Sequence, residues 1–113
     1  ANVDPVPPHD VQPEEPAIAI GIAQTQQATT WEIRRPTATW AGLRSFVPDG
    51  EIVIGFDGAS PGFFWLAAQG GYGIQSAAGA SLLAASLIEG APLPDELHAA
   101  GVDPAVVSPN RLR

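Results

Sequence analysis

Apolar residues near the start of the chain recur at the spacing of an α-helix. Ile18 and Ile22 lie four positions apart, and Pro16 falls in the first turn, where a helix tolerates proline. This spacing predicts a helix over residues 14–28. Ile20 also alternates with its apolar neighbours, so a strand is the competing interpretation of the same stretch.

Bulky or β-branched residues alternate with polar ones over residues 30–47, which is the period of a β-strand, and two short apolar runs follow at 51–56 and 63–68. Turn residues such as Pro48-Asp49-Gly50 divide the region. The pattern predicts an antiparallel meander with strands over residues 30–47, 51–56 and 63–68. Pro36 places the first strand at a sheet edge or a bulge. The third strand is apolar throughout, so we expect it to be buried on both faces.

The clearest helix is predicted over residues 74–89, and Gly90 supplies its C-terminal stop. One face of this helix carries Ile74, Ala77, Ala78, Ser81, Leu82, Ala85 and Ile88. The other side of this helix is slim because it carries small residues, so a sheet or a flat ligand can approach it closely. Shorter helices are predicted over residues 95–100 and from Pro104 onward, the latter with Asp103 as its N-cap.

These elements make an α+β fold, and the composition narrows the classes of function. With 113 residues, 45% of them hydrophobic, the chain can form one small core. A net charge of −7 disfavours binding to nucleic acid or to anionic membrane surfaces. The chain has no cysteine, which excludes disulfides and thiolate metal sites. No signal peptide is visible and residues 77–88 are too short a stretch to span a bilayer, so we expect a cytoplasmic protein.

A glycine-rich loop, residues 69–75 (QGGYGIQ), joins the third predicted strand to the long predicted helix. Exposed amide N–H groups with the positive end of a helix dipole behind them form a site for an anion or an electron-rich group. The loop nearly matches the dinucleotide-binding fingerprint, but neither the second parallel strand nor its acidic residue follows. A complete nucleotide site is therefore not predicted. A plain tight turn is the competing interpretation.

Arg44 lies among the apolar residues Trp40, Leu43 and Phe46, so we expect its guanidinium to be partly desolvated. A desolvated arginine normally faces an anion, and its fork matches a carboxylate at two points. The alternative is an internal ion pair with one of the twelve acidic residues.

The other charged residues give weaker signals. Arg34 and Arg35 fit a solvated strand edge. His9 has acidic neighbours, but two histidines without paired spacing do not indicate a metal site, and His98 has no visible partner. Nothing fixes a catalytic triad or a carboxylate pair, so no catalytic and no metal-binding residue is assigned.

Residues 39–46 (TWAGLRSF) and 62–75 (GFFWLAAQGGYGIQ), with the spacing between them, resemble the C-terminal part of the FAD-dependent D-amino-acid oxidase and dehydrogenase family. The resemblance implies a fragment of a two-domain FAD oxidoreductase that converts D-amino acids to imino acids and then 2-oxo acids. Its parts would be an extended segment plus helix (1–29), strands of the substrate domain (30–68), and the glycine loop with a flavin-facing helix and short helices (69–113).

The resemblance also implies roles for individual residues. The substrate-binding residues would be Arg44, Gly42, Gly71 and Gln75, with Arg44 holding the carboxylate and the Gly71 carbonyl accepting from the amine. The cofactor-binding residues would be Gly70, Gly71, Tyr72, Gly73, Ile74 and Gln75. Of these, Gln75 and the N–H groups of Tyr72, Gly73 and Ile74 would face the flavin pyrimidine edge, where negative charge develops on reduction.

The implied partners are an amino acid substrate and the remainder of the enzyme, including an N-terminal Rossmann part. Without that part we expect the chain to be inactive and to self-associate through its apolar surface. The alternatives are a subunit of the glycine or sarcosine oxidase type and a non-catalytic domain that retains the fold.

Overall fold

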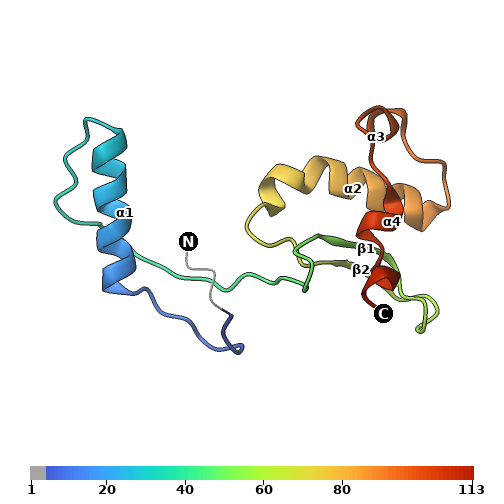
Figure 1. Ribbon diagram of the computed structural model, residues 1–113, viewed down its shortest axis with the longest axis horizontal. Helices are drawn as coiled ribbons and strands as arrows, with labels where there is room; N and C mark the ends of the chain where they lie inside the picture. Colours follow the sequence, from blue (N-terminus) through green and yellow to red (C-terminus); the bar gives the residue numbers. More distant parts are fainter. Residues whose placement is uncertain (1–4) are drawn as a thin grey trace. The chain divides into compact units, whose positions relative to one another are not determined.

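A computed structural model describes residues 5–113, which divide into one compact unit up to Leu43 and a second from Arg44 (Figure 1). In chain order the elements are α1 (Glu15–Ala28), β1 (Val53–Phe56), β2 (Phe64–Ala67), α2 (Gly73–Glu89), α3 (Asp95–Ala99), α4 (Pro104–Val107) and the 3-10 helix η1 (Pro109–Leu112). This is a small α+β fold, as the sequence predicts.

Helix α1 is the one regular element of the first unit in the described part of the chain. The predicted helix is confirmed, with a proline in its first turn, and the strand interpretation is wrong. Ile18 and Ile22 lie on its less exposed side, but no residue of α1 is buried. Within its own unit the helix therefore gains little from packing.

The strand predicted over residues 30–47 is wrong: this stretch has no regular structure. Alternation reports which residues suit a pleated surface, whereas a strand also needs a neighbour with which to pair. This stretch pairs with no strand among residues 5–113. Its large side chains stay in solvent, with Trp31 67% and Trp40 85% exposed.

The second unit is built on an antiparallel hairpin of β1 and β2, with Val53 opposite Ala67 and Phe56 opposite Phe64. The two phenylalanine rings pack edge to face with their centroids 5.0 Å apart. The predicted turn at Pro48-Asp49-Gly50 and the last two predicted strands are confirmed, the strands in shortened form. The meander is thus reduced to two strands in the described residues.

The expectation that the last strand is buried on both faces is wrong. Trp65 is 38% and Leu66 46% exposed. Strand β2 pairs with β1 along one edge, and α2 packs against β1. Because α2, α4 and η1 pack mainly against β1, the side chains of β2 are less covered and keep part of their apolar surface in water.

The core lies where α2 crosses β1 (Figure 1), and its buried members are Ile52, Ile54, Leu83, Ala84 and Leu97. The slim side of α2, with Ala80 and Ala84, packs against the hairpin, where small residues let the backbones approach; the sequence leaves open whether a sheet or a flat ligand lies there. The predicted apolar face points away: Ile74 is 97% and Ile88 57% exposed. Gly90 ends α2 in the left-handed conformation, which confirms the predicted stop.

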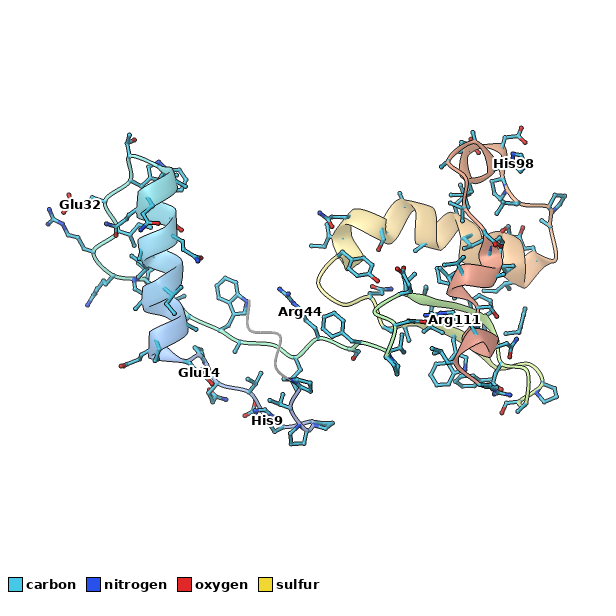
Figure 2. All side chains as sticks on the ribbon, in the orientation of Figure 1. His9, Glu14, Glu32, Arg44, His98 and Arg111 are labelled. Carbon is cyan, nitrogen blue, oxygen red and sulfur yellow. The ribbon has the colours of Figure 1, made fainter. Side chains whose placement is uncertain are left out.

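The last segment, residues 108–113, is tied to the hairpin by polar side chains, a role that sequence reasoning missed. Asn110 Oδ1 accepts a bond from the Gly58 N–H (3.0 Å), and Arg113 Nη2 lies 2.6 Å from Asp57 Oδ1. Arg111 pairs with Asp49 beside β1 (Figure 2). The two short helices that precede this segment, α3 and α4, are as predicted. Asp103 caps α4 by accepting a hydrogen bond from the Ala105 N–H at 2.9 Å.

Candidate functional site at the start of helix α2

The glycine loop between β2 and α2 is held by its own backbone and by the chain around residue 45. The Tyr72 N–H donates to the Gln69 carbonyl (3.2 Å), and the Gly70 N–H donates to the Ser45 carbonyl (3.1 Å). The Phe46 ring lies so close to Gly70 that a Cβ there would be 2.8 Å from it. The loop therefore has a defined path that brings residues 44–46 beside the start of α2.

Helix α2 begins without a cap. Tyr72 occupies the N-cap position without a side-chain hydrogen bond, and the first turn carries no acidic residue. The first helical bond runs from the Ser76 N–H to the Tyr72 carbonyl. The amides of Gly73, Ile74 and Gln75 have no acceptor among residues 5–113. Three free donors and the helix dipole make this end attractive to a negative or electron-rich group.

Arg44 stands beside this loop, although its surroundings differ from those predicted. The expected desolvation is wrong, because the side chain is exposed on a stretch that no helix or strand of its unit covers. The alternative of an internal ion pair fails as well, since no carboxylate among the described residues lies within 4.0 Å of Arg44. The guanidinium is free to bind an anion from solution.

The Arg44 side chain lies against Gly71. A Cβ on Gly71 would be 2.7 Å from Arg44 Nη1 and 3.3 Å from Cζ, so the guanidinium occupies the space that any larger residue would fill. In Figure 2 the labelled Arg44 is on the chain that leads into the hairpin, ahead of β1. The Arg44 guanidinium and the backbone of the glycine loop therefore lie next to each other.

An open depression of about 450 Å³ surrounds this contact. Its lining residues are Arg44, Gln69, Gly70, Gly71, Tyr72, Gly73, Ile74, Gln75 and Ala77. The structure thus gathers the sequence-predicted substrate and cofactor residues with one exception. Gly42 belongs to the first unit, where it is exposed, so its place in the site stays a prediction.

Gln69 is the member of this depression to which sequence reasoning gave no role. Its Oε1 lies 2.7 Å from the position that a Cβ on Gly73 would take, so the amide group covers the first residue of α2. The available signal was a lone polar residue between an apolar strand and the first glycine.

The remaining polar candidates are not among the residues that line this depression. The His9 ring nitrogen is 2.8 Å from the Pro7 carbonyl, and His98 is exposed on α3 (Figure 2). Arg34 pairs with Glu32 at 3.2 Å in full solvent. Residues 5–113 contain no group of three or more His, Cys, Asp or Glu side chains placed to hold a metal ion. In the same residues, no helix has both the length and the apolar character needed to cross a membrane.

A family model described as FAD dependent oxidoreductase (DAO) matches residues 4–87. The match covers most of the 113 residues and includes Arg44, the glycine loop and nearly all of α2. The residues at the start of α2 suit a flavin, because three free amides beside a glycine-rich loop can meet the electron-rich edge of its ring. FAD is the cofactor of this family. The chain belongs to the FAD-dependent oxidoreductase family.

Proposed function

We propose that this chain is the substrate-binding and flavin-facing part of an enzyme that oxidises D-amino acids, of the D-arginine dehydrogenase type. The observation that carries the proposal is the Arg44 guanidinium, which has no carboxylate partner among residues 5–113 and lies against Gly71 in the depression at the start of α2. A free cation beside a backbone carbonyl is the pair of groups that an amino acid requires.

On the substrate side, Arg44 holds the carboxylate through two parallel N–H···O bonds. The Gly71 carbonyl accepts from the substrate ammonium or amine, and the backbone of Gly42 lines the same pocket. These contacts fix the Cα–H bond in one orientation, so that the side chain of the amino acid projects away from the glycine loop. Orientation of this kind lowers the barrier because the reacting atoms need no further search.

On the cofactor side, the amides of Gly73, Ile74 and Gln75, which have no acceptor among residues 5–113, and the side chain of Gln75 would hold the pyrimidine edge of the flavin. When bound, FAD supplies a two-electron acceptor for the hydride on the substrate Cα, and the imino acid product then hydrolyses in water. The amides favour negative charge at this edge, which raises the tendency of the flavin to accept electrons. Gln69 lies beside the first of these residues, with its Oε1 2.7 Å from the position that a Cβ on Gly73 would take.

The test is Arg44→Met in the complete, FAD-loaded enzyme. A charged two-point contact contributes about 1.5–3 kcal/mol, so KM for a D-amino acid rises roughly 10- to 100-fold while the flavin spectrum is retained. Arg35→Met is the matched control, because Arg35 is equally exposed but lies outside the depression. It leaves KM unchanged.

Two results would contradict the proposal. One is a KM in Arg44→Met equal to that of the control, which removes the carboxylate-binding role. The other is faster turnover of glycine or N-methylglycine than of any D-amino acid by the unaltered enzyme, which supports the glycine or sarcosine oxidase type instead. If the complete, unaltered protein folds but binds no FAD, the chain is instead a non-catalytic domain.

A further inference from the structure

Arg111 and Asp49 form an ion pair of the second unit in which the arginine is largely enclosed. Arg111 Nε and Nη2 donate to the two carboxylate oxygens of Asp49 at 2.8 and 3.0 Å, which is a two-point contact. The same guanidinium also donates to the Glu51 carbonyl (3.0 Å) and the Ser108 carbonyl (2.9 Å). Its side chain is only 15% exposed. A guanidinium with four bonds and little solvent around it is a fixed point in the structure.

Asp49 belongs to the turn that precedes β1. The Gly50 N–H closes the turn on the Val47 carbonyl at 2.9 Å, and Gly50 has a φ of 79°, which favours glycine. Asp49 Oδ1 also accepts from the Glu51 N–H at 3.0 Å. Arg111 thus holds the turn in one conformation and fixes the direction in which the Gly50 carbonyl points.

The Gly50 carbonyl accepts a hydrogen bond from the Tyr72 hydroxyl at 2.9 Å. Tyr72 is the N-cap residue of α2, and its ring also lies over Gly70, where a Cβ would be 3.1 Å from Tyr72 Cε1. The glycine loop is therefore tied to the turn by a side chain, in addition to the backbone bond between Gly70 and Ser45.

We propose that Arg111, Asp49 and Tyr72 are positioning residues that hold the glycine loop and the free amides of α2 in the geometry that the flavin requires. The role rests on the proposed function, because it concerns the same amides. None of the three side chains needs to touch a reacting atom. They act in series, from residues 108–113 through the turn at 48–50 to the start of α2.

The first measurement is residue-resolved amide hydrogen exchange on the complete chain. In Tyr72→Phe the ring stays and one hydrogen bond is lost, so exchange of the Gly70 and Tyr72 amides accelerates about fivefold. Arg111→Gln accelerates the same amides and those of the turn at 48–50. Arg111→Lys, which keeps the charge but not the two-point contact, gives an intermediate rate and is the variant to use where Arg111→Gln lowers overall stability.

The matched control is Arg113→Gln. Arg113 lies in the same segment and has its own ion pair, but with Asp57 in the hairpin turn. Its loss accelerates exchange in residues 57–62 and leaves the glycine loop unchanged. Equal loop exchange in Tyr72→Phe and the unaltered chain overturns the proposal. An equal effect of Arg113→Gln and Arg111→Gln on the loop does so too, because it would mean a general loosening.

The second measurement separates this inference from the proposed function. In the complete, FAD-loaded enzyme, Tyr72→Phe shifts the visible absorption band and the reduction potential of the flavin, whereas Arg113→Gln does not. If loop exchange responds as expected but the flavin does not, the positioning of the loop is supported and the contact between loop and flavin is wrong. If the flavin of the unaltered enzyme binds elsewhere, the exchange measurement still decides whether the three residues hold the glycine loop.

Discussion

At the scale of single residues, the contact between Arg44 and Gly71 carries the most information. Sequence reasoning could name both residues, because an arginine among apolar residues and a run of glycines are visible locally. It could not foresee that the guanidinium would occupy the space beside Gly71 or that Arg44 would be exposed. Those facts depend on the path of the chain between them, which no local pattern encodes.

Gly71→Ala tests this contact without disturbing the fold. The new methyl group would meet the end of the Arg44 side chain, which can swing aside, so the free energy of unfolding changes by less than about 1 kcal/mol. On the proposed function, the displaced guanidinium would no longer meet the substrate carboxylate, so we expect KM for a D-amino acid to rise several-fold in the complete enzyme.

Gly79→Ala on α2 is the comparison for that variant, since a Cβ there meets only Leu97, at 3.8 Å. Thermal unfolding and steady-state kinetics on both variants give the result. Unchanged kinetics in Gly71→Ala would show that Arg44 reaches its ligand from another position.

At the scale of elements, the helices followed from the sequence and the first strand did not. Helical spacing, a proline in the first turn and a glycine stop act within a few residues, so α1 and α2 were predicted nearly to their ends. A strand depends on a partner distant in sequence. The stretch over residues 30–47 has the right alternation but no such partner among the described residues.

The two long helices should differ in stability. Helix α1 has no buried residue and fourteen residues in all, and isolated helices of about that length are marginal in water. Helix α2 buries Leu83, Ala84 and Ser86 in the core. In the chain by itself, we expect amides in the middle of α2 to exchange at least roughly a hundredfold more slowly than those of α1.

Amide hydrogen exchange followed by mass spectrometry measures both helices in one experiment. Comparable protection of α1 and α2 would mean that α1 packs against a surface in solution. The ratio is therefore a direct measure of how much of the stability of α1 comes from elsewhere.

At the scale of the whole molecule, polar side chains of residues 108–113 close the second unit. Four donors bond to the Asp57 carboxylate. Three belong to the hairpin and its turn, namely the Trp65 indole N–H and the amides of Ala59 and Ser60, and the fourth is Arg113. The pKa of Asp57 lies well below its ordinary value. The hydrogen bond from Trp65 is the largest cause, and the other donors add to it. The Asp49 pKa is lowered as well, chiefly by its bond to Arg111. Sequence reasoning gave residues 108–113 no such role, because the partners of Arg111 and Arg113 lie more than fifty positions away.

These lowered pKa values predict acid lability. A carboxyl whose pKa is lower in the folded state stabilises the fold above its unfolded pKa, about 3.9 for aspartate, and this stabilisation is lost as the pH falls below it. The unaltered chain is therefore more stable than Asp57→Asn at pH 7, and the difference shrinks progressively below about pH 4.

Urea unfolding at several pH values measures that difference. Asp10→Asn is the control, because Asp10 is exposed and belongs to no ion pair among the described residues. A gap between Asp57→Asn and the unaltered chain that is the same at pH 7 and pH 2.5 would show that hydrogen bonds, and not charge, account for it.

The slim side of α2 has a consequence for which positions control the chemistry. The helix is a rod of seventeen residues, about 25 Å long, whose first turn presents the free amides and whose later turns rest on β1 through Ala80 and Ala84. A larger side chain at either alanine lifts the rod from the hairpin and tilts its amides with it. On the proposed placement of the flavin, selection for altered redox behaviour should therefore find substitutions at 80 and 84, two or three turns from the free amides, as readily as in the loop itself.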